Sequence, residues 1–177
     1  MRKIDFGFIQ GRMTSPPSKK ILQYFPIKNW KKEFYYAEKY SFDFIEYFGE
    51  RKYNKNNPIW NYKNLKEINE LVKIKKLQNY SFCDDYFINT SLINFKNFDQ
   101  YYKTLIKNLA LINIKVYILA LFEKSLINKK NLKNFIQKLQ NISDNLKEKK
   151  IKLALETNLD VQSIKKLIKL ITRKNVF

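Results

Sequence analysis

Histidine is absent from this sequence of 177 residues, and cysteine occurs only once, at Cys83. A single cysteine excludes an intramolecular disulfide, and Cys83 has none of the neighbours of a zinc site, so we expect a small core residue rather than a nucleophile. No apolar run approaches the roughly 20 residues that cross a bilayer. The opening residues lack the apolar region and cleavage site of a signal peptide. We therefore expect a cytoplasmic location and no membrane partner.

Glycine is also scarce, with three residues in the whole chain, and no GxGxxG or Walker loop is present. An open, doubly wound α/β sheet that binds a nucleotide usually carries such a glycine-rich loop after its first strand. The scarcity of glycine therefore counts against that architecture.

Acidic residues are few: 16 stand against 35 lysines and arginines, which gives a formal net charge of +19. Such an excess suggests a polyanion as partner. The excess is nearly all lysine, however, and it comes with abundant Asn, Ile, Tyr and Phe, which share A/T-rich codons. Arginine suits bidentate phosphate recognition best, and it occurs only at Arg2, Arg12, Arg51 and Arg173. We do not expect nucleic-acid binding as the main function.

Short apolar runs alternate with longer amphipathic ones along the chain. The apolar runs predict five strands, at residues 3–10, 43–48, 79–83, 114–122 and 151–155. Apolar residues at helical spacing predict five helices, at residues 29–40, 62–77, 98–112, 128–149 and 161–171. Asn29 and Asp160 are the expected N-caps of the first and last helix. Residues 175–177 are expected to open a sixth strand.

Strands that are joined by helices must run parallel, because each crossover returns the chain to the same end of the sheet. A closed eight-stranded barrel needs roughly 250 residues, so this chain holds only part of one. The sequence therefore predicts an α/β protein, an incomplete (β/α)8 TIM barrel with about five βα units and the start of a sixth strand. We expect one partial barrel domain over residues 1–177.

Polar side chains stand at the predicted carboxyl ends of the strands, where functional groups gather in a parallel α/β fold. They are Gln10, Arg12, Glu46, Asp84, Asp85, Glu123 and Glu156. Carboxylates that meet in one cleft indicate a cation, a shared proton or a substrate with many hydroxyls. Other roles stay open: ion pairs with lysine for Glu46 and Glu123, helix or turn capping for the two aspartates, and a pocket-closing salt bridge for Arg12.

Four segments carry a resemblance to a known family. They are residues 7–13 (GFIQGRM) with the prolines and aromatics that follow, 43–47 (DFIEY) with Asn57-Pro58, 81–87 (SFCDDYF) and 153–159 (LALETNL). In this order they resemble the sugar phosphate isomerase/epimerase family with a xylose isomerase-like TIM barrel. The resemblance covers essentially the whole chain.

The resemblance implies an aldose–ketose isomerase or epimerase that acts on a sugar, sugar phosphate or related polyol. Such enzymes bind a divalent cation, Mn²⁺ or Mg²⁺, that polarises a carbonyl while a carboxylate moves a proton on the adjacent carbon. By the same resemblance Glu156 is the catalytic residue and the first metal ligand. The expected substrate contacts are Gln10, Arg12, Glu46, Asp85 and Glu123.

The family's pattern is incomplete in this sequence. It has no histidine and ends at Phe177, before the strands that would supply the next acidic ligand, a histidine and a second glutamate. One carboxylate cannot hold a cation that needs about six ligands. We therefore expect a truncated chain that is inactive alone and holds no cofactor, unless an oligomer or a second chain completes the barrel. The alternative is a non-catalytic protein that binds sugars or polyanions.

Overall fold

A computed structural model describes residues 4–16 and 24–177 of the chain. Five strands form one sheet in the order of the chain: β1 (Gly7–Ile9), β2 (Phe44–Gly49), β3 (Gln78–Asp84), β4 (Val116–Leu121) and β5 (Lys152–Thr157). Every neighbouring pair of strands is parallel. The predicted parallel sheet is therefore confirmed.

The last residues begin the predicted sixth strand beside β5. Val176 forms an isolated parallel bridge with Leu153. The backbone N–H of Phe177 donates to the carbonyl of Leu153 at 3.0 Å, and the N–H of Leu155 donates to the carbonyl of Phe177 at 2.9 Å. The sheet therefore continues past β5 in the same sense.

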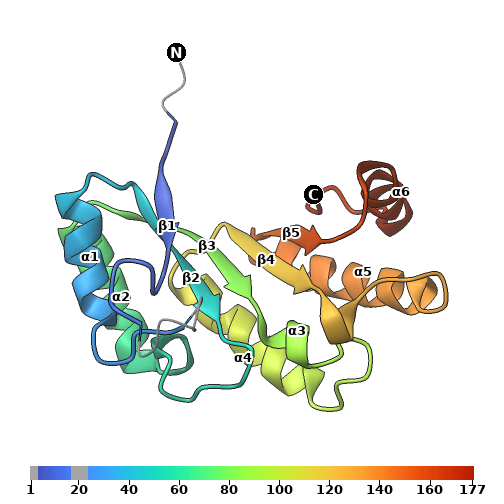
Figure 1. Ribbon diagram of the computed structural model, residues 1–177, viewed down its shortest axis with the longest axis horizontal. Coiled ribbons are helices and arrows are strands. Elements are labelled where there is room, and N and C mark those ends of the chain that lie inside the picture. Colours follow the sequence, from blue (N-terminus) through green and yellow to red (C-terminus); the bar gives the residue numbers. More distant parts are fainter. Residues whose placement is uncertain (1–3, 17–23) are drawn as a thin grey trace.

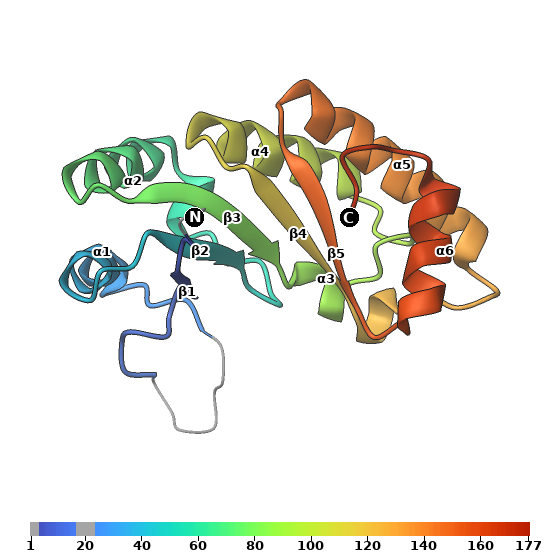
Figure 2. The same cartoon turned by 90° about the horizontal axis from the view of Figure 1, so that it is seen from above.

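Long helices follow the strands: α1 (Trp30–Lys39), α2 (Tyr62–Ile74), α4 (Phe98–Leu111), α5 (Leu132–Glu148) and α6 (Val161–Ile171). Figure 1 shows them alongside the sheet, and Figure 2 shows that they follow one another around the outside of its curve. The concave face of the sheet is not covered by these helices. Helices outside curved parallel strands are the arrangement of an incomplete α/β barrel, which confirms the predicted fold class.

Apolar side chains from the helices and from the outer face of the sheet form the core. The fully buried members include Phe34 of α1, Leu65 of α2, Leu109 of α4, Leu139 of α5 and Leu153 of β5. Each such side chain contributes about 1.5–3 kcal/mol when it leaves water. None of the helices within the described residues is long and apolar enough to span a membrane.

The long helices end at residues other than glycine, because glycine is scarce in this chain. A residue with positive φ follows or ends each long helix, a position where glycine is preferred because it lacks a Cβ. Here the positions are held by Ser41, Lys76, Asn113, Lys150 and Thr172, with φ between 55° and 59°. The chain therefore accepts local backbone strain at five places to end its helices.

The predicted elements differ from the structure mainly at their ends. The first strand is limited to Gly7–Ile9, and α5 starts at Leu132 instead of residue 128. The delay in α5 has a local cause, because the side chains of Asn128 and Asn131 accept hydrogen bonds from nearby backbone N–H groups and close a turn. Short helical turns were not predicted at α3 (Tyr86–Asn89), η1 (Pro58–Trp60) and η2 (Glu123–Ser125).

The two predicted N-caps have different outcomes. Asp160 accepts hydrogen bonds from the backbone N–H groups of Gln162 and Ser163, at 2.9 and 3.0 Å, and so caps α6 as predicted. Asn29 occupies the N-cap position of α1, but its side chain makes no capping hydrogen bond. The prediction of a side-chain cap at Asn29 is therefore wrong.

Candidate functional site

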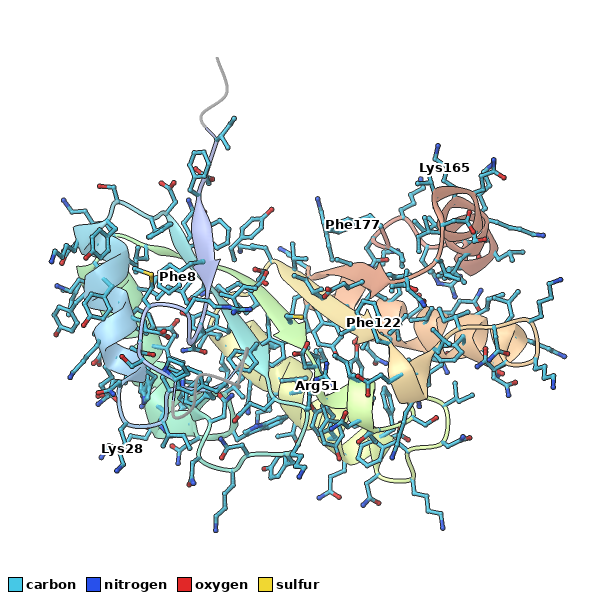
Figure 3. The ribbon with its side chains drawn as sticks, viewed as in Figure 1. Phe8, Lys28, Arg51, Phe122, Lys165 and Phe177 are labelled. Carbon is cyan, nitrogen blue, oxygen red and sulfur yellow. The ribbon has the colours of Figure 1, made fainter. Side chains whose placement is uncertain are left out.

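A cleft of about 820 Å³ lies at the carboxyl-terminal ends of the strands. Four predicted site residues line it, namely Glu46, Asp85, Glu123 and Glu156. The apolar part of the wall includes Ile9, Ile118 and Phe122. Figure 3 labels Phe122, which follows β4, and Arg51, which follows β2; both line this cleft. The structure therefore brings together carboxylates from four separate segments of the sequence.

Strand register explains why these side chains share one face. Ile9 of β1 pairs with Glu46 of β2, and Ala120 of β4 pairs with Glu156 of β5. Neighbouring residues in register point to the same side of a sheet, whereas consecutive residues alternate. Glu46 and Glu156 therefore face the concave side, while Tyr47 packs against Phe34 of α1 on the helix side.

A bulge in β3 changes which of its residues face the cleft. Ile45 pairs with Asn79, but Tyr47 pairs with Phe82, so the register shifts by one residue between them. Asn79 still lies on the helix side, where it accepts a hydrogen bond from Tyr47 Oη at 2.5 Å. After the shift, Cys83 faces the cleft. Bulges of this kind re-aim side chains and often lie beside functional sites.

Glu46 receives its closest polar contact from the bulged strand. Ser81 Oγ donates a hydrogen bond to Glu46 Oε2 at 2.6 Å. Burial raises the pKa of Glu46, the hydrogen bond from Ser81 lowers it, and the negative charges of Glu156 and Asp85 raise it further. The carboxyl group therefore retains a proton at a higher pH than an exposed glutamate does.

Asp85 and Cys83 form the next part of the wall. The backbone N–H of Asp85 donates to the carbonyl of Gly49 at 2.9 Å, which ties the end of β3 to the end of β2. The Cys83 thiol lies 3.5 Å from Asp85 Oδ1 and 3.7 Å from Glu156 Oε2. Burial and then the carboxylates around it raise the pKa of this thiol. A thiol that keeps its proton is a poor nucleophile, in line with the expectation for Cys83.

Asp85 has a pKa that is raised by burial, lowered by the hydrogen bond from Cys83, raised by the charge of Glu156 and lowered by Arg51. Glu123 is the first residue of η2 and forms an ion pair with Arg51, in which Nη1 lies 2.8 Å from Oε1. Of the two open roles for Glu123, the structure shows an ion pair, although with arginine rather than lysine. Arg51 was not among the predicted site residues, because it lies in a loop without any periodic pattern.

Gln10 and Arg12 do not line this cleft. The side chain of Gln10 is buried, and its Nε2 has no hydrogen-bond partner among the described residues. Arg12 is exposed in the turn after β1, where its backbone N–H donates to the carbonyl of Ile9 at 3.1 Å. A role of these two residues in substrate binding stays a prediction.

Asp84 lies away from the cleft, although it was grouped with Asp85 at the end of the strand. Its carboxylate is fully buried between the sheet and α4, where it accepts hydrogen bonds from Tyr117 Oη at 2.7 Å and Tyr101 Oη at 3.0 Å. It also accepts the backbone N–H of Tyr86 at 3.2 Å. Burial raises the pKa of Asp84 to about 6. Alternation along the strand separates the two neighbours, so Asp84 serves packing, including the turn into α3.

The carboxylates of the cleft do not fit a complete site for a divalent cation. Within residues 4–16 and 24–177, no group of three or more His, Cys, Asp or Glu side chains is placed to hold a metal ion. A divalent cation such as Mg²⁺ needs several protein oxygens around it. Glu156 therefore lacks the further ligands that such a site requires in this part of the chain.

The sequence matches no protein family and no curated protein. Solved structures with a similar fold do exist. A D-psicose 3-epimerase from Clostridium cellulolyticum, solved with D-tagatose, is 13% identical with a TM-score of 0.73, and the match covers 98% of this chain and 62% of that one. A xylose isomerase-like TIM barrel protein from Mycobacterium smegmatis, solved with magnesium, is 14% identical with a TM-score of 0.64, covering 85% and 55% of the two chains.

A third similar structure is that of the IolI protein with a bound zinc atom, which is 17% identical with a TM-score of 0.62, covering 82% of this chain and 54% of that one. These likenesses confirm the predicted fold, an incomplete α/β barrel of the TIM type. The chain spans between 54% and 62% of the length of these three structures.

Proposed function

We propose that this chain is the first part of a sugar isomerase or epimerase of the xylose isomerase-like type, and that its cleft binds a sugar. One observation carries the proposal: in a chain with a net charge of +19, four carboxylates from four separate segments line one cleft. This cleft lies at the carboxyl ends of parallel strands, where barrels of this fold place their active sites. The D-psicose 3-epimerase with D-tagatose supports a ketohexose as the substrate class.

The carboxyl groups suit a ligand that is rich in hydroxyls. An ionised carboxylate accepts hydrogen bonds only, whereas a protonated carboxyl also donates one. Burial raises the pKa of both Glu46 and Asp85, so each carboxyl group keeps its proton to a higher pH than an exposed one does. The wall can therefore donate to and accept from sugar hydroxyls, while Ile9, Ile118 and Phe122 contact the carbon skeleton.

Glu156 is the residue that we propose for proton transfer and as the first metal ligand, in keeping with the resemblance of residues 153–159 to the family. Its carboxylate stands on β5 beside the thiol of Cys83. The described carboxylates do not fit a complete cation site, so the proposal derives no step through a metal. Holding and moving one proton at a carbon next to a carbonyl needs a positioned carboxylate, which Glu156 supplies.

Both edges of the sheet carry exposed apolar side chains, which favour pairing with further βα units that would complete the barrel. At one edge, Phe6 and Ile4 precede β1 and expose 62% and 70% of their surface; at the other, Phe177 exposes 54%. Edge strands carry unpaired backbone N–H and C=O groups, and exposed apolar side chains beside them favour another strand. We propose that a second chain, another copy or a further segment pairs at these edges, and that the chain is inactive without it.

Titration with D-tagatose, followed by calorimetry and by NMR amide shifts, tests the proposed site. We expect binding that weakens by roughly tenfold or more in Glu46→Gln and Glu156→Gln, because each loses a charge-assisted hydrogen bond to the sugar. Glu148→Gln is the matched control, since Glu148 lies at the end of α5 and does not line the cleft. Equal binding by all four proteins, or amide shifts far from the strand ends, would contradict the proposal.

A further inference from the structure

Arg51 is the one basic residue among the described residues that line the cleft, whereas four lining residues carry carboxyl groups. It follows β2 and faces the end of β4, because its Nη1 donates to Glu123 Oε1 at 2.8 Å. The charge of Arg51 also lowers the pKa of Asp85. The guanidinium thus pairs with one of the four acidic groups of the cleft and acts electrostatically on a second.

The segment that carries Glu123 is held firmly against the rest of the molecule. Ser125, at the end of η2, is fully buried, and its Oγ accepts the backbone N–H of Leu92 at 2.9 Å and donates to the carbonyl of Thr90 at 3.1 Å. Glu123 has a φ of 44°, a left-handed conformation that residues with a side chain rarely adopt. Strain of this kind persists where the surroundings fix the backbone, and it is concentrated at functional sites.

The local charge of the cleft is opposite to that of the whole chain. The net charge of +19 would draw a phosphate ester toward the protein, but at physiological salt charges more than about 8 Å away are largely screened. Inside the cleft a phosphate group meets Glu46, Asp85 and Glu156. The cation that could hold it, Arg51, already donates to Glu123.

We propose that Glu123 withholds the guanidinium of Arg51 from anionic groups, so that the cleft selects an uncharged sugar over its phosphate ester. This inference rests on the proposed sugar-binding function for its physiological meaning, and it names the substrate class of that site. The masking of Arg51 itself is a property of the ion pair and can be measured with phosphate alone. Glu123 and Arg51 are in this sense specificity-determining residues.

The test compares the binding of inorganic phosphate, D-fructose and D-fructose 6-phosphate at constant physiological ionic strength. The wild-type protein should bind D-fructose more tightly than its 6-phosphate. Glu123→Gln frees the guanidinium for bidentate phosphate binding and should raise the affinity for both phosphate ligands at least about fivefold relative to the affinity for D-fructose. The additional substitution Arg51→Gln should abolish this gain.

Asp144→Asn is the matched control, because Asp144 on α5 forms an ion pair with Arg173, which follows α6; Arg173 Nε lies 2.6 Å from Asp144 Oδ1. It frees an arginine and changes the net charge by the same amount, but neither residue lines the cleft. Phosphate affinity that is unchanged by Glu123→Gln, or raised equally by Asp144→Asn, would overturn the inference. Gain of phosphate binding in Glu123→Gln without any binding of D-fructose would instead refute the proposed function and leave the masking of Arg51 standing.

Discussion

Replacing the buried Glu33 with glutamine should stabilise the protein at neutral pH. Glu33 lies on α1 with no exposed surface, and its Oε1 accepts the backbone N–H of Gly11 at 2.7 Å. Its other oxygen, Oε2, has no hydrogen-bond partner among the described residues. Gly11 has a φ of 92°, and a Cβ there would lie 2.2 Å from the carbonyl oxygen of Tyr24, so the turn after β1 is fixed in shape around this carboxyl group.

The size of the effect follows from the pKa of Glu33, which burial raises from 4.5 to about 7. The folded state therefore binds the proton more tightly than the unfolded chain does. The contribution of protonated Glu33 to the free energy of unfolding is fully present below pH 4.5 and is lost as the pH rises through about 7. Each unit of pKa corresponds to about 1.4 kcal/mol, so ionisation costs the folded state at most roughly 3 kcal/mol.

Glutamine keeps the acceptor for Gly11 and removes the ionisation. Its amide nitrogen is as poorly partnered as the protonated oxygen that it replaces, so the two proteins should have similar stability near pH 4.5. By pH 8 the variant should be more stable than the wild type by up to roughly 3 kcal/mol. The free energy of unfolding, measured by urea denaturation at several pH values, gives this difference directly.

Glu38→Gln is the control for this experiment, because Glu38 lies on the same helix but is exposed and pairs with Lys75 at 2.8 Å. Lys75 is only 14% exposed, but Glu38 is 49% exposed, so the loss of this pair should change the free energy of unfolding by no more than about 1 kcal/mol. A constant difference between Glu33→Gln and the wild type from pH 4.5 to 8 would refute the reasoning. So would a variant that is less stable than the wild type at pH 8.

Two further predictions concern the core and the sheet edges. Asp84→Ala removes the acceptor of the buried Tyr117 hydroxyl and of the Tyr101 hydroxyl, so the free energy of unfolding should fall by about 2–4 kcal/mol. Tyr101→Phe removes only one of these hydrogen bonds and should lower the free energy of unfolding by about 1 kcal/mol. Equal losses in the two variants would contradict this account. The open edges predict association that increases with concentration in sedimentation velocity runs; a monomer at every concentration would count against completion of the barrel by another copy.

The pattern of the sequence was sufficient to predict the sheet. Apolar runs that alternate with amphipathic helices allow only parallel strands, and parallel strands place their carboxyl ends at one side. That is why Glu46, Glu123 and Glu156, more than 30 residues apart along the chain, could be expected in one cleft before the structure was known. The positions of these three glutamates depend on the order and direction of the strands, which the periodicity of the sequence predicts.

The sequence could not predict which side chains of β3 face the cleft, because this depends on a single inserted residue, the bulge in β3. Counted by strict alternation from Asn79, which lies on the helix side, Ser81, Cys83 and Asp85 would also face the helices. The bulge in β3 reverses this, since Tyr47 pairs with Phe82. No residue in the segment marks the bulge, because β3 contains neither glycine nor proline. The contact of Ser81 with Glu46 follows from this reversal and was missed for the same reason.

The bulge also determines which of the two adjacent aspartates faces the cleft. Asp84 points to the helix side and meets the hydroxyls of Tyr101 and Tyr117, whereas Asp85 points to the cleft and meets the thiol of Cys83. Both carboxyl groups have a raised pKa because both are buried. The charges of Glu156 and Arg51 also act on the pKa of Asp85, so its protonation is coupled to groups that line the cleft. The geometry of one irregular strand thus separates a packing carboxylate from one that can take part in binding.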